Sequence, residues 1–179
     1  MTAPWAAARE WILRADVEGG YANDPDDPGG ETNHGISKRS YPGLDIKNLT
    51  EDEAAEIYRR DYWEPCNCDE LPAGLALAVF DAAVNQGRSA AIRLLQRAIE
   101  SLGWGRLTAD GIVGPNTLAG ARACWREDPV FTLAEYLSFR ADRYAQRAHE
   151  APAQSKYRRG WLKRLFKLEA ACLQTGVPA

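Results

Sequence analysis

The stretch that decides the fold is 89–103, which reads Ser-Ala-Ala-Ile-Arg-Leu-Leu-Gln-Arg-Ala-Ile-Glu-Ser-Leu-Gly. Its apolar residues recur every three or four positions, so they share one broad face of a helix. Ser89 has the chemistry of a helix N-cap, and Gly103 has that of a terminator. The pattern predicts a buried helix over about 89–102.

The same periodicity predicts six further helices, which makes the domain dominated by α-structure. Thr50-x-x-Glu53 has the form of a capping box, and Pro72 suits the first position of a helix. Gly114-Pro115 follows the turn signal Asp110-Gly111 and starts a helix of about ten residues. The other predicted ranges are about 5–16, 50–62, 71–85, 133–149 and 155–173.

Residues 19–37 break this pattern. They read Gly-Gly-Tyr-Ala-Asn-Asp-Pro-Asp-Asp-Pro-Gly-Gly-Glu-Thr-Asn-His-Gly-Ile-Ser, with two prolines and five glycines. This composition excludes a helix and is compatible with turns and at most a small β-hairpin. Long loops inside a compact domain are usually functional. We therefore expect the loop or hairpin at about 19–40 to carry the active site.

Length and composition favour a single compact domain over 1–179. The chain has 179 residues, of which 45% are hydrophobic and 26% are charged, and no repeat recurs. A chain of this size can bury a continuous core. The same values exclude disorder, collagen-like repetition and coiled coil as descriptions of the whole chain.

Charge is divided unevenly at Gly87. Residues 1–87 hold 17 acidic and 7 basic side chains, a net charge of −10, whereas residues 88–179 hold 8 and 15, a net charge of +7. We therefore distinguish an acidic part at 1–87 from a basic helical part at 88–179. The basic part suits an anionic partner such as a wall polymer, lipid head groups or nucleic acid, and internal charge complementarity explains the division equally well.

Targeting and redox features point to synthesis in the cytoplasm. The sequence has no run of about 18 apolar residues. Its first residues, 1–8, lack the basic and apolar regions of a secretory signal. The four cysteines have no metal-ligand spacing, so we interpret them as reduced thiols rather than as a disulfide or a zinc site. They are Cys66, Cys68, Cys124 and Cys172.

Three side chains in and beside the 19–37 segment have the chemistry to cleave a glycosidic bond. Glu18 is predicted at the C-terminal end of the first helix, where the helix dipole and partial burial would raise its pKa, as a general acid requires. Asp27 lies in a polar stretch where it ionises easily, and Thr32 offers a hydroxyl that could hold a water. The alternative is that the acidic residues of this loop only solvate its turns.

A calcium-binding loop starting at Asp24 is excluded. Pro28 occupies its fifth position, and Gly35 occupies its twelfth, where a bidentate glutamate is required. Neither His34 nor His149 has the companions of a metal site. We expect no metal and no cofactor.

The motifs of this segment resemble the signature of the family 108 glycoside hydrolases. This family comprises N-acetylmuramidases found among phage endolysins and secretion-associated wall hydrolases, and the resemblance implies a lysozyme-like α+β fold. In the family the glutamate of the Glu-Gly-Gly-Tyr motif is the catalytic acid, which implies this role for Glu18. The order of Glu18, Asp27 and Thr32 also resembles that of the phage-type lysozymes. The matching residues are Glu18-Gly19-Gly20-Tyr21, Asn23-Asp24-Pro25, Asp27-Pro28-Gly29-Gly30, Thr32 and Gly35-Ile36-Ser37.

Residues from about Leu75 onward resemble the peptidoglycan-binding region that follows the catalytic part in this family. Asp81, Asn85 and Gln86 lie at i, i+4 and i+5, so one helix presents them together. They could bind sugar hydroxyls or N-acetyl groups, or they could cap neighbouring backbone. The resemblance rests on Phe80-Asp81-Ala82-Ala83-Val84-Asn85-Gln86-Gly87, Asp110-Gly111-Ile112-Val113-Gly114-Pro115-Asn116-Thr117 and Gly160-Trp161-Leu162-Lys163-Arg164.

The predicted C-terminal helix is amphipathic and basic. Such a helix can contact an anionic membrane or outer-membrane surface. The alternative is that its apolar side packs into the core while its charges stay in water. The apolar stripe consists of Tyr157, Trp161, Leu165, Leu168 and Cys172, and the basic residues are Lys156, Arg158, Arg159, Lys163, Arg164 and Lys167.

The resulting prediction is a peptidoglycan hydrolase with lysozyme activity, an N-acetylmuramidase that cleaves the β-1,4 bond between N-acetylmuramic acid and N-acetylglucosamine. A phage endolysin for host lysis is the favoured setting, made in the host cytoplasm without a signal peptide and acting on the wall in the periplasm. The alternatives are a lytic transglycosylase and a non-catalytic peptidoglycan-binding or secretion accessory protein. We expect a monomer that binds glycan strands and no nucleic acid. The predicted substrate-binding residues are Tyr21, Asn23, Asp24, Asn33, His34, Asp81, Asn85 and Gln86.

Overall fold

The computed structural model describes residues 3–23 and 30–176. Within these two stretches the chain forms seven α-helices and one three-stranded antiparallel sheet. The α-dominated fold predicted from the sequence is confirmed. The helices are α1 (Ala3–Ile12), α2 (Glu51–Tyr58), α3 (Ala73–Gln86), α4 (Arg88–Ser101), α5 (Pro115–Glu127), α6 (Pro129–Glu150) and α7 (Arg158–Gly176).

The sheet has one strand more than the predicted hairpin. It consists of β1 (Tyr21–Ala22), β2 (Thr32–Asn33) and β3 (Ile36–Ser37) in that order. Asn33 pairs with Tyr21 on one side and with Ile36 on the other. His34 and Gly35 join β2 to β3 and have φ angles of 48° and 75°. Positive φ at both central residues is the geometry of a two-residue hairpin turn that matches the twist of its strands.

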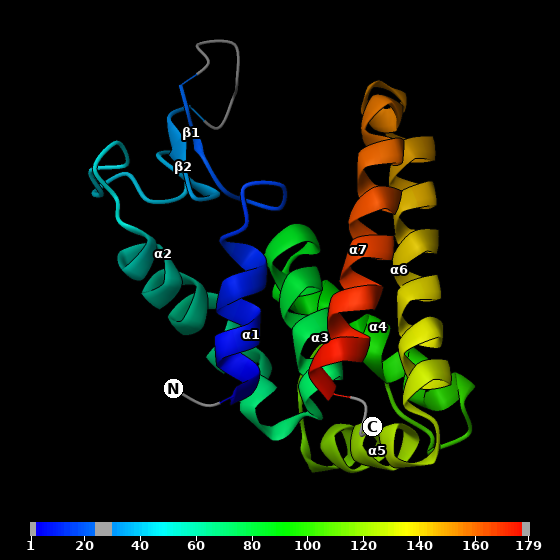
Figure 1. Ribbon diagram of the computed structural model, residues 1–179. Coiled ribbons are helices and arrows are strands. Elements are labelled where there is room, and N and C mark those ends of the chain that lie inside the picture. Colours follow the sequence, from blue (N-terminus) through cyan, green and yellow to red (C-terminus); the bar gives the residue numbers. More distant parts are fainter. Residues whose placement is uncertain (1–2, 24–29, 177–179) are drawn as a thin grey trace.

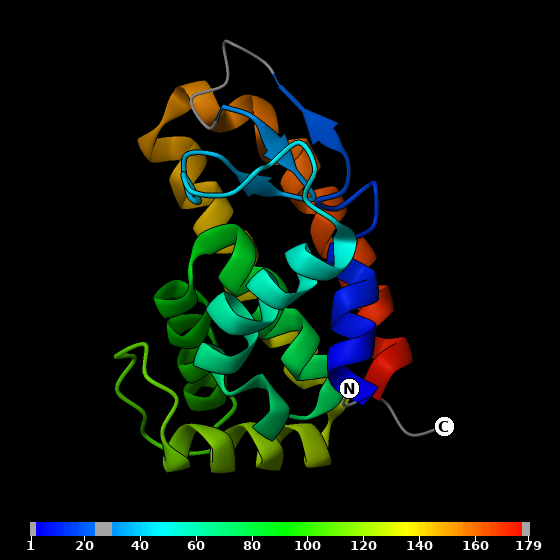
Figure 2. The same ribbon diagram turned by 90° about the vertical axis from the view of Figure 1, so that its left-hand side faces the viewer.

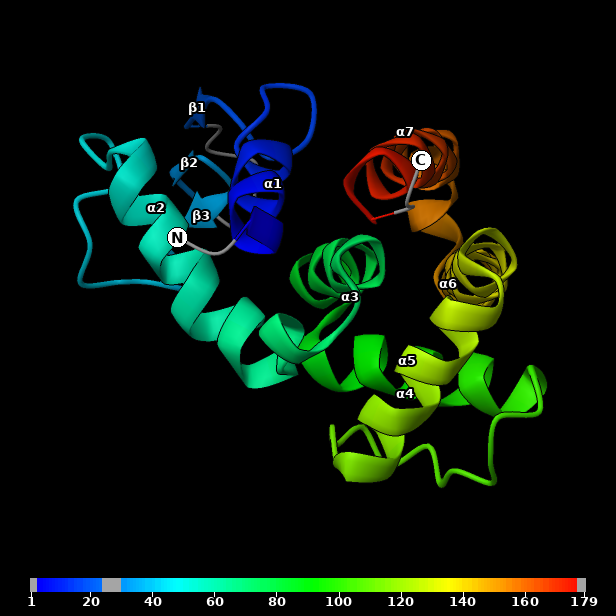
Figure 3. The same cartoon turned by 60° about the horizontal axis from the view of Figure 1, so that its bottom comes forward.

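Helix α3 lies at the centre of the helical part. It packs against α1, α4, α6 and α7, and Figure 3 shows it among these helices. Residues 74–83 are buried without interruption, as expected for a helix that is apolar around its whole circumference. The sheet stands beyond one end of α1, and the α6–α7 pair extends toward the same end of the molecule on the other side of α3 (Figures 1 and 2).

One hydrophobic core contains buried side chains from both the acidic and the basic part. Trp5, Trp63 and Phe80 form an aromatic cluster, with ring centroids 5.3 to 5.7 Å apart. Leu95 and Tyr136, from the basic part, belong to the same core. The described residues therefore share a core although the two parts carry opposite net charges.

Three helix boundaries differ from their predictions. Helix α1 ends at Ile12, four residues early, and Glu18 lies in the turns that follow rather than on the helix. Ser89 is not an N-cap, because α4 begins at Arg88 and the Ser89 hydroxyl accepts a hydrogen bond from Arg93 within the helix. Helix α6 begins at Pro129, where the Asp128 side chain accepts from the Phe131 N–H at 2.9 Å and acts as the N-cap.

The capping box at Thr50 is confirmed. The Thr50 hydroxyl accepts from the Glu53 backbone N–H at 3.3 Å, and the Glu53 carboxylate accepts from the Thr50 N–H at 2.9 Å. Two donors at the start of α2 are satisfied in this way. The helix continues into a π-helical turn (Arg59–Trp63), so its far end leads directly into the core at Trp63.

All four cysteines lie in the described part of the chain as free, buried thiols. Burial raises the pKa of Cys124 to about 11, which keeps this thiol protonated and unreactive at neutral pH. No helix among the described residues is both long and apolar enough to cross a membrane.

A buried carboxylate joins four helices at the centre of the fold. Asp81 on α3 has no exposed surface. Its two oxygens pair with Arg140 of α6 at 2.5 Å and with Arg164 of α7 at 2.7 Å, and one of them accepts from the Trp11 indole of α1 at 2.8 Å. Burial alone would raise the pKa of Asp81, but the two guanidinium groups outweigh it and hold the pKa well below its usual range.

Asp81→Asn is expected to lower the free energy of unfolding by about 3–5 kcal/mol, because Arg140 would keep a buried charge without its partner. Chemical denaturation at pH 7 measures this. The pKa of Asp81 is lower in the folded than in the unfolded state, so its contribution is present above about pH 4 and is lost as the pH falls through the folded value. The difference between wild type and variant should therefore shrink in acid.

Asp142→Asn on the exposed face of α6 is the matched control, and its stability should stay within about 0.5 kcal/mol of wild type. If both variants unfold at the same denaturant concentration as wild type, the ion cluster does not hold the helices together.

Candidate active site

Glu18 lies in the turns between α1 and the sheet, where its carboxylate meets α7. Its side chain is 23% exposed, and Oε1 accepts a hydrogen bond from Nη1 of Arg164 at 2.6 Å. Its backbone N–H bonds to the Arg14 carbonyl at 3.2 Å, which holds the turn. The acid is therefore fixed at both its backbone and its side chain.

The turn between β2 and β3 packs directly on Glu18. A β-carbon placed on Gly35 would lie 2.8 Å from Cβ of Glu18 and would also collide with the Tyr58 hydroxyl. That hydroxyl donates to the His34 carbonyl at 2.8 Å and ties the turn to α2. Burial raises the pKa of Tyr58, and the Glu18 carboxylate adds to the effect. Tyr58 consequently remains a protonated donor, and only glycine fits at position 35.

Burial raises the pKa of Glu18 above its usual value and outweighs the opposing pull of the Arg164 guanidinium. A raised pKa keeps more of the carboxyl protonated near neutral pH, as a general acid requires. The predicted direction agrees with the structure, but the predicted cause was wrong in part. Glu18 is not on the last turn of a helix, so burial rather than the helix dipole accounts for the shift.

Arg164 belongs to the candidate site, although the sequence placed it only in a motif of the peptidoglycan-binding region and among the basic residues of the C-terminal helix. Its side chain is 13% exposed and bridges Glu18 to Asp81. Burial lowers the pKa of Arg164, but the two carboxylates outweigh burial and raise it. The sequence does contain a signal that Arg164 faces inward. It lies three residues after Trp161 and four before Leu168, which places it on the apolar side of its helix.

The loop residues predicted to act on the substrate differ in their exposure and in their hydrogen-bond partners. Asp24 and Asp27 lie outside the described residues. Tyr21 is 48% exposed and donates to Glu31 at 2.9 Å. Asn23 is exposed at the end of β1. Thr32 is half-buried on β2, and its hydroxyl donates to the Gly30 carbonyl at 3.2 Å.

Asn33 and His34 are less exposed than Tyr21 and Asn23. Asn33 is buried, and its side-chain amide donates to the carbonyls of Ile46 at 3.1 Å and Leu49 at 3.2 Å. It anchors the 46–49 segment to β2, which does not fit the predicted contact with sugar. Nδ1 of His34 is buried and has no hydrogen-bond partner among the described residues.

The three polar residues of α3 separate into two roles. Asp81 is fully buried between arginines, so it does not touch a substrate as predicted and acts on the site only through Arg164. Asn85 accepts from the Tyr144 hydroxyl at 2.5 Å, and this hydroxyl also accepts from Arg140 at 3.1 Å. Gln86 instead lines a cavity beside α6.

The described residues contain no group of three or more acidic, His or Cys side chains able to hold a metal.

Comparisons with known proteins agree with this geometry. Residues 10–87 match the family model described as Glycosyl hydrolase 108, and residues 90–166 match the model described as Predicted Peptidoglycan domain. Eleven chains of solved structures match. Among them is SagA from Brucella abortus, with a TM-score of 0.78 and 28% identity over 98% of this chain and 97% of that chain. No curated protein matches the sequence.

The α-dominated fold with its small sheet is lysozyme-like, and the family match over residues 10–87 makes the protein a glycoside hydrolase. Residues 10–87 belong to the glycosyl hydrolase 108 family, and the region that matches the peptidoglycan domain follows them at 90–166. It is a peptidoglycan hydrolase.

Arg164→Gln is expected to move the alkaline limb of the pH profile of kcat/KM upward by about 1 pH unit, because it removes the cation that lowers the pKa of Glu18. The acid must be protonated to act, so activity falls as the pH rises through this pKa. Measuring kcat/KM for soluble glycans between pH 4 and about 9 locates this alkaline limb. Arg164→Lys should restore most of the wild-type profile.

Lys163→Gln, one residue away on the exposed side of α7, is the control and should leave the profile unchanged. An Arg164→Gln protein that is folded by circular dichroism but keeps the alkaline limb of the wild type would show that Arg164 does not set the pKa of Glu18.

Proposed function

We propose that the protein is an N-acetylmuramidase that hydrolyses the β-1,4 bond between N-acetylmuramic acid and N-acetylglucosamine. The observation that carries the proposal is Glu18, a partly buried acid with a raised pKa held between Gly35 and Arg164. Glu18 protonates the leaving oxygen of the glycosidic bond. Breaking this bond without a proton donor would leave an unstable alkoxide.

Asp27 and Thr32 complete the proposed mechanism. Asp27 stabilises the oxocarbenium-like transition state, or it positions the attacking water together with Thr32. Thr32 lies on β2, two residues before the turn that packs on Glu18, which supports its place at the site. The proposed substrate contacts from the loop are Tyr21, Asn23, Asp24 and His34.

Glu18→Gln should lower muramidase turnover by at least about a hundredfold, because it removes the proton donor and keeps the size of the side chain. Release of muropeptides from purified peptidoglycan measures turnover, and mass spectrometry of the products identifies the reaction. Reducing muramic ends indicate hydrolysis, and 1,6-anhydro ends indicate a lytic transglycosylase, which needs only the acid. No release by wild type would indicate a binding or accessory protein.

Glu169→Gln on α7 changes an acid away from Glu18 and is the matched control for the loss of a carboxylate. Asp27→Asn should lower turnover about as much as Glu18→Gln does if Asp27 is the base or nucleophile, and less if Asp27 only stabilises charge. Activity of Glu18→Gln within tenfold of wild type would place the acid elsewhere.

The proposed setting is a phage endolysin that acts as a monomer on the wall in the periplasm after synthesis in the host cytoplasm. The order of Glu18, Asp27 and Thr32, which resembles that of phage-type lysozymes, supports it. The 1–87 part carries the acid and the proposed loop contacts with the substrate, and the 88–179 part supplies Arg164 and contains the region that matches the peptidoglycan domain.

The exposed side of the α7 region supports contact with an anionic wall or membrane surface. The predicted stripe separates here, because Leu165, Leu168 and Cys172 pack in the core while Tyr157 is 53% exposed. Phe166, which lies outside the stripe, is 70% exposed. Arg164 and Lys167 are also engaged, the latter with Asp16 at 2.8 Å. The remaining basic residues surround a shallow hollow of about 450 Å³ with Phe166 and Leu162. They are Lys156, Arg158, Arg159 and Lys163.

Changing these four residues to Gln should flatten the salt dependence of activity on permeabilised cells. Clustered charges act over about 10 Å at 0.1 M salt, whereas Glu18 acts at contact distance and is screened less. Turnover of short soluble glycans should stay at the wild-type value. If both substrates lose activity together, this region serves folding and not surface contact.

A further inference from the structure

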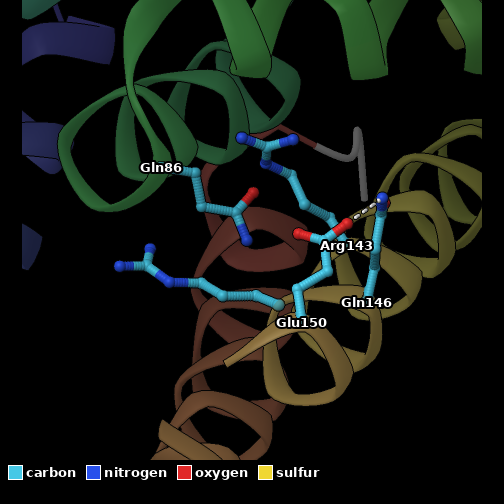
Figure 4. Close-up of a pocket in the computed structure, with 5 residues that line it drawn as sticks. Gln86, Arg143, Gln146 and Glu150 are labelled. Atoms are coloured by element: carbon cyan, nitrogen blue, oxygen red, sulfur yellow. Dashed lines mark hydrogen bonds between the residues drawn. The ribbon is translucent and has the colours of Figure 1, made fainter. Parts of the chain in front are cut away.

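A cavity of about 260 Å³ lies where the end of α3 meets α6. It is lined by Gln86, Arg143, Gln146, Arg147 and Glu150. In Figure 4, Gln86 extends from the end of α3 toward Arg143, Gln146 and Glu150 on α6. All five side chains are polar, and none of them is aromatic.

Gln86 is the unusual member of this set. Both its amide oxygen and its amide nitrogen are shielded from solvent, and neither has a hydrogen-bond partner among the described residues. Leaving a buried donor or acceptor unpaired costs about 1–3 kcal/mol for each group. A side chain that offers one acceptor and two donors to a cavity matches the carbonyl and N–H of a peptide group.

The charges around the cavity favour a ligand with a carboxylate. The lining contains two arginines and one glutamate, so its charged side chains carry a net positive charge. Glu150 accepts from Gln146 at 2.7 Å, and Arg147 donates to Gln154 at 2.6 Å while lying over the Trp161 ring. Arg143 has neither an ion pair nor a side-chain hydrogen bond within residues 3–23 and 30–176. Its guanidinium is therefore available to a carboxylate, which it can bind through two parallel hydrogen bonds.

The cavity and Glu18 are connected through α3 and Arg164. Asp81, which shares Arg164 with Glu18, is five residues before Gln86 on α3, about 7.5 Å along the helix axis. An extended tripeptide spans about 10 Å. A stem tripeptide is thus longer than the rise along α3 from Asp81 to Gln86.

We propose that this cavity binds the peptide stem of the substrate, with Gln86 pairing with a peptide group and Arg143 binding a stem carboxylate. The inference rests on the proposed muramidase function, because muramic acid is the sugar that carries the stem. A strand without stems carries a carboxylate only on the lactyl group of muramic acid, close to the sugar ring, whereas a stem places its carboxylates farther out along the peptide. The cavity would thus make the enzyme prefer peptide-bearing strands over peptide-free ones.

The test compares two substrates, glycan strands with uncrosslinked stems and the same strands after an amidase has removed the stems. The ratio of their kcat/KM values should fall about fivefold or more in Gln86→Ala and in Arg143→Gln, mainly through KM for the stem-bearing strands. Gln174→Ala and Arg126→Gln, exposed residues of α7 and α5, are matched controls and should keep the wild-type ratio.

Stability separates a binding role from a structural one. Removing an unpaired buried amide costs no hydrogen bond, so Gln86→Ala should unfold at a temperature equal to or above that of wild type. A large loss of stability in this variant would show instead that Gln86 supports the fold.

Titration calorimetry with the tripeptide L-Ala-D-Glu-diaminopimelate measures binding to the cavity without any cleavage of glycan. Glu18→Gln protein should bind the tripeptide, and adding Gln86→Ala or Arg143→Gln should weaken binding about fivefold or more. If wild type cleaves neither strand, the proposed function fails, but this titration still shows whether the cavity binds the peptide stem. Equal kcat/KM ratios in wild type and variants, together with no tripeptide binding, would overturn the inference and leave the muramidase standing.

Discussion

The structure depends on one constraint, which is that Asp81 is ionised in the middle of the core. A carboxylate without exposed surface needs cations, and α6 and α7 supply them as Arg140 and Arg164. Arg164 then has a nitrogen left for Glu18, so the cluster contains two carboxylates and two guanidinium groups. Because breaking such a cluster is costly, α1, α3, α6 and α7 are held in one arrangement. The position of the acid follows from this arrangement.

The same cluster explains how an acid can touch an arginine and still have a raised pKa. Arg164 gives Nε and Nη2 to Asp81, and only Nη1 to Glu18. Most of its charge is therefore satisfied by a carboxylate that is ionised at every relevant pH. Asp81 also adds a negative charge near Glu18, which raises the pKa further after burial has done so. Asp81 therefore acts on Glu18 from inside the core, through its charge and through Arg164.

Local sequence patterns predicted the helices well and the site only in part. Periodicity and the capping box found the helices because these signals act over a few residues, as in α2 and α4. Arg164 was missed as a site residue because its partner Glu18 is 146 residues away, and no local rule connects them. The third strand was missed for a similar reason. It depends on positive φ at His34, which is uncommon for residues other than glycine, and on the packing of Gly35 against Tyr58.

The uneven division of charge at Gly87 had two explanations, and the structure assigns them to different residues. Several acids of the first part pair with bases of the second, as in Asp81 with Arg140, Glu70 with Arg122 and Asp16 with Lys167. For these residues the asymmetry is internal complementarity that holds the two parts together. Lys156, Arg158, Arg159 and Lys163 make no ion pair among the described residues and gather around Phe166. Their charge is not needed to balance an acid of the fold, so an anionic surface is the partner that their position favours.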